Sequence, residues 1–171
     1  MQEEGRGRIM MIKDSGNRME FDSGAVRDIQ EGKGRCDLLP LDVAAQFLTK
    51  PYAAILGQIL RFQDDGDAFH LIKAVELFAE IRFDDCYTML LETSKHFEEG
   101  AKKYGEWNWQ KGLPVRSYIN SAVRHLLKWL RSDEDEPHDR AFCWNILCAA
   151  WTCMHLPYLN EYAVKGGESG D

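Results

Sequence analysis

The sequence has no apolar run that approaches the roughly 20 residues a transmembrane helix needs. Its most apolar stretch, residues 141–154, is shorter and is interrupted by Asn145 and Thr152. Residues 1–8 are followed only by the short run IMMI, which is too little for a secretory signal peptide. These absences predict a soluble, cytoplasmic protein that does not act at a membrane.

Paired cysteines and excess positive charge are also missing. The five cysteines form no C-x-x-C pair, which argues against a structural zinc site and predicts free thiols. The formal net charge of -7 argues against a general nucleic-acid or membrane-surface binder, although a small anionic ligand needs only local basic groups. The GKGR at residues 32–35 lacks the Ser or Thr of a phosphate-binding P-loop.

The 171 residues, 44% of them hydrophobic, are enough for one domain with a real core. Residues 1–35 combine glycine with mixed charge and predict an extended arm, with one short strand at residues 9–13. Residues 36–164 predict a single all-α domain, a helical bundle. Residues 165–171 predict a disordered tail.

Apolar residues spaced by three and four predict the helices of this domain. The expected segments are 40–48, 52–62, a third carrying the stripe from Leu71 to Ala79, then 86–104, 115–130 and 139–156. Asp84 or Asp85 is expected to cap the fourth helix and Asp139 or a neighbour the sixth. The core stripe expected on the fourth helix is Cys86, Leu90, Phe97, Ala101 and Tyr104.

The stretch RSDEDEPHDRAFCWN, residues 131–145, allows two interpretations. Taken alone, its acids favour a solvated turn before a helix. Alternatively, two or three carboxylates bind Mg²⁺ or Mn²⁺, which take oxygen ligands and often bridge protein to phosphates. Asn145 lies among apolar residues, where a buried amide needs hydrogen-bond partners from the core or from a ligand.

Basic and aromatic residues surround this region. Four basic residues could bind a metal-bound polyphosphate, or could be the ordinary charged residues of a solvent-exposed helix surface. They are Lys102, Lys103, Arg124 and Lys128. The loop EWNWQKGLP, residues 106–114, supplies aromatic rings that stack on a base or that only hold the loop in place.

Four blocks in order carry a resemblance to a known family. They are SGAVRDIQEGKGRCDLLP (23–40), FEEGAKKYGEWNWQKGLP (97–114), SYINSAVRHLLKWL (117–130) and DEDEPHDRAFCWN (133–145). Together they resemble the dATP/dGTP diphosphohydrolase family, largely phage-encoded and similar to the MazG-like all-α nucleotide pyrophosphohydrolases. The segment at residues 49–93 is longer than in many relatives.

The resemblance implies a MazG-like bundle that hydrolyses a purine deoxynucleoside triphosphate, dGTP or dATP, to the monophosphate and pyrophosphate. It also implies a divalent cation, Mg²⁺ or Mn²⁺, a homo-oligomer (dimer or tetramer), and a host-cell cytoplasm if a phage encodes the chain. MazG-like enzymes carry E-x-x-E and E-x-x-D pairs on successive helices. This chain offers only Glu98 with Glu99, and Glu136-x-x-Asp139.

Site residues follow from the matched blocks. The expected metal ligands are Glu98, Asp133, Asp135 and Glu136, and the expected catalytic residues are Glu98, Glu136 and His138. The expected substrate-binding residues are Arg27, Lys33, Arg35, Asp37, Lys102, Lys103, Tyr104, Asn108, Trp109, Arg124, His125 and Asn145.

Three alternatives stay open at this point. A catalytically weak module would bind a purine nucleotide without releasing pyrophosphate. A helical protein-binding adaptor would use the acidic stretch only as a solvated face. A triphosphohydrolase with paired His-Asp ligands would release inorganic triphosphate, but His138-Asp139 is the only such dipeptide.

Overall fold

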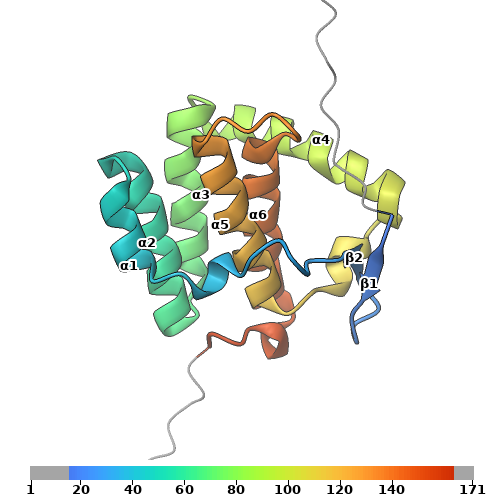
Figure 1. The fold of residues 1–171 in the computed structure, drawn as a ribbon. Helices are drawn as coiled ribbons and strands as arrows, with labels where there is room; N and C mark the ends of the chain where they lie inside the picture. The colour runs from blue at the N-terminus through green and yellow to red at the C-terminus, as the bar shows by residue number, and fades with distance from the viewer. Residues whose placement is uncertain (1–15, 164–171) are drawn as a thin grey trace, which may run out of the picture.

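The computed structural model describes residues 16–163, and its architecture is all-α, as the sequence predicts (Figure 1). The helices are α1 (Leu41–Ala44), α2 (Lys50–Asp65), α3 (Ala68–Arg82), α4 (Cys86–Tyr104), α5 (Val115–Leu130) and α6 (His138–His155). Short 3-10 turns, η1 (Cys36–Leu38), η2 (Ala45–Phe47), η3 (Asn108–Lys111) and η4 (Pro157–Leu159), join or follow them. A two-stranded hairpin, β1 (Arg18–Glu20) and β2 (Val26–Asp28), precedes the bundle.

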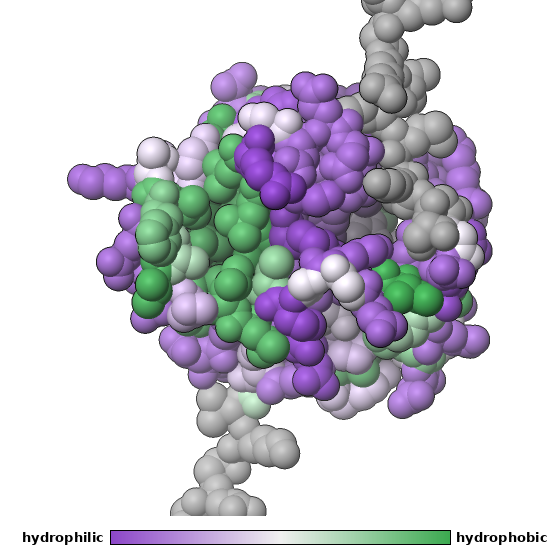
Figure 2. Space-filling model, in the orientation of Figure 1, coloured by the Kyte–Doolittle hydropathy of each residue, from purple (hydrophilic) through white to green (hydrophobic). Residues whose placement is uncertain are grey.

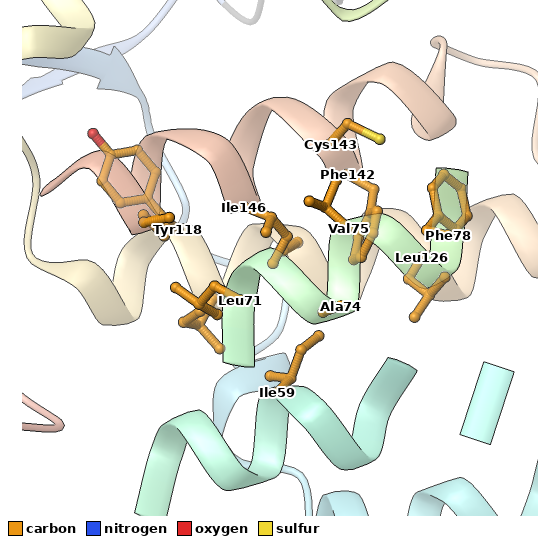
Figure 3. Packing of buried hydrophobic residues seen from close by; sticks show 14 of the residues in the cluster. Ile59, Leu71, Ala74, Val75, Phe78, Tyr118, Leu126, Phe142, Cys143 and Ile146 are labelled. Carbon is orange, nitrogen blue, oxygen red and sulfur yellow. The ribbon is translucent and has the colours of Figure 1, made fainter. Parts of the chain in front are cut away.

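The core lies where α2, α3, α5 and α6 pack together. In Figure 3, α3 lies between α2 and α6, with its apolar side chains directed to both. Phe78 of α3 packs against Phe142 of α6 at 4.7 Å between ring centroids and against Trp129 of α5 at 5.0 Å. Both phenylalanines are fully buried. The long segment at residues 49–93 is therefore part of the main core, because α2 and α3 supply much of its apolar surface.

Local sequence signals explain most helix ends. Gly66 adopts a left-handed conformation (φ 72°) that ends α2, and the Asp67 side chain accepts from the Phe69 amide to cap α3. Asp85 caps α4 by accepting from the Thr88 amide at 2.7 Å, as expected. The expectation for α6 was wrong in detail, because Pro137 precedes the helix and Asp139 instead pairs with Arg82 at 2.8 Å.

The expected core stripe of α4 was also wrong in part. The buried residues of this helix are Met89, Thr93 and His96, whereas the Leu90 side chain is half exposed. The reason is visible in Figure 1, where α4 crosses the end of the bundle and its C-terminal half reaches the hairpin. In that half, Phe97 and Ala101 line a cavity, and Phe97 also packs against the edge of the core.

The hairpin was not anticipated, and the strand expected at residues 9–13 lies outside the described residues. β1 and β2 pair antiparallel with Met19 opposite Arg27. Gly24 (φ 77°) sits in the turn, where its amide donates to the Phe21 carbonyl at 2.7 Å. Three residues per strand are too few to give a readable alternating pattern.

Large apolar side chains are exposed on the segment from η1 to η2, namely Leu38, Leu39, Val43 and Phe47. On the face shown in Figure 2, apolar residues gather on the side of the molecule formed by α1 and α2. No helix within residues 16–163 has the length and apolar character of a membrane span, and all five cysteines are free thiols. The homo-oligomer stays a prediction that size-exclusion chromatography with light scattering tests.

Phe142→Ala should lower the free energy of unfolding by about 3–5 kcal/mol, because it opens a cavity between α3, α5 and α6. Chemical denaturation followed by circular dichroism measures this loss. The matched control is Phe47→Ala, whose side chain is 85% exposed, and it should change stability by less than about 0.5 kcal/mol. Equal losses in the two variants would contradict this assignment of the core.

Candidate active site

A cavity of about 770 Å³ lies between the hairpin, the C-terminal half of α4, η3, α5 and α6. This volume is in the range of small-molecule sites. Its charged and aromatic lining residues are Arg27, Asp28, Lys33, His96, Phe97, Glu98, Tyr104, Glu106, Trp107, Trp109, Tyr118, Arg124, His125, Lys128, Asp135, Glu136 and Trp144. Five separate elements therefore contribute to one site.

The hairpin is fastened over this cavity by polar contacts. The side-chain amide of Asn108 forms two hydrogen bonds with the backbone of Val26, both at 3.0 Å. Its Nδ2 donates to the Val26 carbonyl, and its Oδ1 accepts from the Val26 backbone N–H. On the opposite side, Lys103 and Tyr104 both donate to the Asp28 carboxylate, at 2.7 and 2.8 Å. Asn108, Lys103 and Tyr104 were expected to contact substrate. In the structure all three bond to β2, and Asn108 and Tyr104 also line the cavity.

Arg27 projects from β2 into the helical part of the site. Its Nη2 donates to Asn145 Oδ1 at 2.7 Å, and the Asn145 amide in turn donates to the Ala141 carbonyl at 2.8 Å. The guanidinium lies over the rings of Tyr118 and Trp144, at 5.7 and 5.8 Å. Burial lowers the pKa of Arg27, and no carboxylate within residues 16–163 pairs with it. Asn145 is therefore a satisfied buried amide that also lines the cavity.

Arg124 and Lys33 add two more cations to the same lining. Arg124 Nη2 donates to Ser121 Oγ at 3.0 Å, while its Nη1 is buried and has no hydrogen-bond partner in the described chain. Desolvation lowers the pKa of both side chains. In residues 16–163 neither forms an ion pair, so this part of the cavity has uncompensated positive charge.

Acids and imidazoles gather where α5 meets the start of α6. His125 Nδ1 lies 3.0 Å from His138 Nδ1, and Glu136 Oε1 lies 3.7 Å from each of these atoms. His138 Nε2 lies 2.8 Å from Asp135 Oδ1. Burial, with nearby Arg124, lowers the pKa of His125 well below its ordinary value, so this imidazole is neutral. Desolvation opposes ionisation of Asp135, but hydrogen bonds from Lys128 and His138 outweigh it and lower the pKa of this carboxyl.

Among residues 16–163, two groups of side chains have the spacing of metal ligands. The first is His125, Glu136 and His138, and the second is Asp133, Asp135 and His138. The structure thus brings together Asp135, Glu136 and His138 from the predicted set. It places Glu98 apart from both groups, 65% exposed and paired with Lys102.

Other predicted residues lie at the margin of the site. Arg35 and Asp37 form an ion pair with each other at 2.6 Å, and neither lines the cavity. Trp109 lines the cavity but packs edge-on against Phe97 and Trp151, at 5.4 and 5.0 Å.

Asp28, Tyr118 and Trp144 were missing from the predicted set, although all three line the cavity. Their positions within the four sequence blocks are the only signal for them.

A family model described as dATP/dGTP diphosphohydrolase, N-terminal, matches residues 69–161, which is more than half of the chain. The chain belongs to the dATP/dGTP diphosphohydrolase family. No curated protein and no solved structure matched the chain. The range matched to the diphosphohydrolase family contains the acid and imidazole cluster and Arg124, whereas Arg27 and Lys33 precede it.

His96 is the remaining unusual group in this site. Its side chain is only 7% exposed, packs beside Trp144 at 5.7 Å, and has a buried Nδ1 without a hydrogen-bond partner in the described chain. Burial, assisted by Arg140, Arg27 and Lys103, lowers its pKa to about 3. The site therefore offers an uncharged imidazole beside cations that repel its protonated form.

This pKa predicts a loss of stability on acidification. The unfolded chain binds a proton at His96 near pH 6.5, whereas the folded chain does not until about pH 3, so stability is complete above pH 6.5 and falls below it. Between pH 6.5 and 5.5 this group removes about 1 kcal/mol. His96→Leu should reduce the pH dependence of unfolding by that amount, measured by denaturation at several pH values.

The matched control is Thr93→Val, a buried residue one turn earlier on the same face of α4 that does not titrate. It should leave the pH dependence unchanged. An unchanged slope in His96→Leu would show that His96 is protonated in the folded protein.

Proposed function

We propose that the protein is a metal-dependent hydrolase that converts dGTP or dATP to the nucleoside monophosphate and pyrophosphate. One observation carries this proposal. The guanidinium groups of Arg27 and Arg124, neither with a carboxylate partner in residues 16–163, line the same cavity as Glu136 and His125.

The uncompensated guanidiniums favour an anionic substrate. A buried charge is costly unless it is paired, and removing two guanidiniums from water without carboxylates leaves donors to be satisfied. Phosphate oxygens suit them, because a guanidinium presents its N–H groups in a planar fork that matches phosphate geometry. Lys33 extends the positive lining beside Arg27 and Arg124, in accordance with the several charges of a triphosphate.

The acid and imidazole cluster fits the divalent cation that such chemistry requires. Its donor set of carboxylate oxygens and neutral imidazole nitrogens is suited to Mn²⁺ and similar ions. A bound cation would stabilise charge on the phosphate oxygens and promote ionisation of a water molecule. The residues that would hold it are His125, Glu136 and His138, with Asp135 next to them.

The remaining residues position the reacting groups. In the proposed reaction, a water oxygen bonds to the α-phosphorus while the bond from that phosphorus to the bridging oxygen breaks, and pyrophosphate leaves with the electron pair. Arg27, Arg124 and Lys33 neutralise the charge that collects on the leaving pyrophosphate. The hairpin, held by Asn108, Lys103 and Tyr104, keeps Arg27 in place for these contacts.

Trp107 is the best candidate for contact with the base. It lines the cavity, its side chain is 63% exposed, and its backbone is left-handed (φ 62°), which is unfavourable for a residue other than glycine. Trp109 is already packed between Phe97 and Trp151, so it offers less free ring surface. A purine presents the larger aromatic face to stack on Trp107.

Arg124→Met should lower kcat/KM for dGTP or dATP by about 100-fold, because a preorganised donor to phosphate is lost. It should leave the melting temperature equal or higher, since a half-satisfied buried charge is removed. Ion-exchange analysis of products, with thermal unfolding of the same samples, measures both effects.

Lys95→Met is the matched control, because Lys95 is exposed on α4 and pairs with Glu92 within the described residues. It should not alter turnover. Release of inorganic triphosphate would contradict the assigned bond cleavage. Nucleotide binding without any turnover would support the binding module, and no binding of any nucleotide would support the adaptor.

Trp107→Ala should raise KM for a purine substrate by roughly 5-fold to 100-fold, the effect of losing about 1–3 kcal/mol of stacking. Trp107→Phe keeps an aromatic face and should recover most of the affinity. Steady-state kinetics with dGTP, dATP and dCTP would show the effect. An unchanged KM in Trp107→Ala would exclude Trp107 as the stacking surface.

A further inference from the structure

We infer that His125 Nδ1, His138 Nδ1 and Glu136 Oε1 form a mixed nitrogen and oxygen site that selects a first-row transition metal ion over Mg²⁺. The inference rests on the proposed function only in placing the ion beside the phosphate-binding cations. Metal selection can be measured without nucleotide, so each idea can fail separately.

The distances between the three donor atoms fit one metal ion. They form a triangle with sides of 3.0, 3.7 and 3.7 Å, whose corners are all about 2.0 Å from one central point. Imidazole nitrogens and carboxylate oxygens bind Zn²⁺ at about 2.0–2.2 Å. A cation at or slightly above that point would therefore contact all three donors without a change of backbone.

The second nitrogen of His138 supports this assignment. Its Nε2 lies 2.8 Å from Asp135 Oδ1, and Lys128 holds the other oxygen of Asp135 at 2.9 Å. Donation from Nε2 fixes the proton of His138 on that atom and leaves the Nδ1 lone pair directed at His125 and Glu136. A carboxylate behind a histidine ligand is the usual outer partner of a metal-bound imidazole.

The Glu136 carboxylate is largely buried and has no lysine or arginine partner among residues 16–163. Its side chain is 16% exposed, and no lysine or arginine of residues 16–163 lies within ion-pair distance of it. A largely buried carboxylate needs a compensating charge or hydrogen bonds. The neutral His125 does not supply that charge, and a divalent cation would.

The contact between the two imidazoles places one proton between them. In the tautomer that carries the His138 proton on Nε2, His138 Nδ1 accepts and His125 Nδ1 donates across the 3.0 Å gap. Binding of a cation displaces this proton, and both Nδ1 lone pairs then become ligands. Only the tautomer of His125 has to change.

The alternative group, Asp133, Asp135 and His138, is less suited to a metal. Arg131 donates to both oxygens of Asp133 in an exposed turn, and Lys128 holds Asp135. Both carboxylates are therefore already neutralised by cations.

The chemistry of the donors sets the selectivity. Mg²⁺ takes oxygen ligands in a strict octahedron and keeps most of its water, whereas imidazole favours Zn²⁺, Ni²⁺, Co²⁺ and, less strongly, Mn²⁺. Two imidazoles among three protein ligands therefore disfavour Mg²⁺.

The test is titration of the chelator-treated full chain with Mg²⁺, Mn²⁺, Co²⁺ and Zn²⁺ by isothermal calorimetry, without nucleotide. We expect one Co²⁺ or Zn²⁺ ion per chain, bound at least 100-fold more tightly than Mg²⁺. Glu136→Gln and His125→Gln should each weaken Co²⁺ binding more than tenfold. Glu134→Gln, the same chemical change at an exposed acid in the same turn, should leave it unchanged, as should Asp133→Asn.

A second measurement uses the unmodified protein, so that metal binding can be tested even if the variants fail to fold. The electron paramagnetic resonance spectrum of bound Cu²⁺ should show coupling to imidazole nitrogen. Equal affinity for Mg²⁺ and Co²⁺, a Cu²⁺ spectrum without nitrogen coupling, or loss of binding only in Asp133→Asn would each overturn the inference. Pyrophosphate release that needs only Mg²⁺, by a protein that does not bind Co²⁺, would refute this site and leave the proposed function standing.

Discussion

The hydrogen bond between Arg27 and Asn145 is the constraint on which the site depends. It joins the N-terminal hairpin to the middle of α6 and fixes a guanidinium among apolar and aromatic residues. A charge in such a place is tolerated only if its donors are satisfied. Asn145 Oδ1 at 2.7 Å and the Ser117 carbonyl at 3.4 Å accept from Arg27 and satisfy part of the guanidinium fork. Because Arg27 also lines the cavity, the hairpin is part of the site.

The charges around the cavity are separated by kind. Arg27, Lys33 and Arg124 provide positive charge without carboxylate partners in the described chain, whereas Glu136 and the two buried imidazoles lie together with the spacing of metal ligands. The proposed substrate, a polyphosphate carrying a divalent ion, would complement both parts at once, which neither a simple anion nor a free cation would. The membership of the chain in the dATP/dGTP diphosphohydrolase family accords with this complementarity.

Much of the fold could be predicted from the sequence, because the limits of α4 and α5 follow apolar spacing and cap residues. The exposure of the Leu90 side chain could not be predicted, because a helix that crosses the end of a bundle buries a different face from one that runs within the bundle. Residues of the four blocks did locate the cavity. Their individual contacts could not be read from sequence, because bonds such as that between Asn108 and Val26 join segments far apart in the chain.

In the proposed function, the cavity binds a metal-bound purine triphosphate between these two groups of charges. A crystal structure of the protein with the α,β-imido analogue of dGTP and Mn²⁺ tests this binding mode. We expect phosphate oxygens within hydrogen-bond distance of Arg27 and Arg124, and the metal ion on Glu136. A structure with the nucleotide bound outside the cavity, or with these guanidiniums unchanged and not in contact with phosphate, would contradict it.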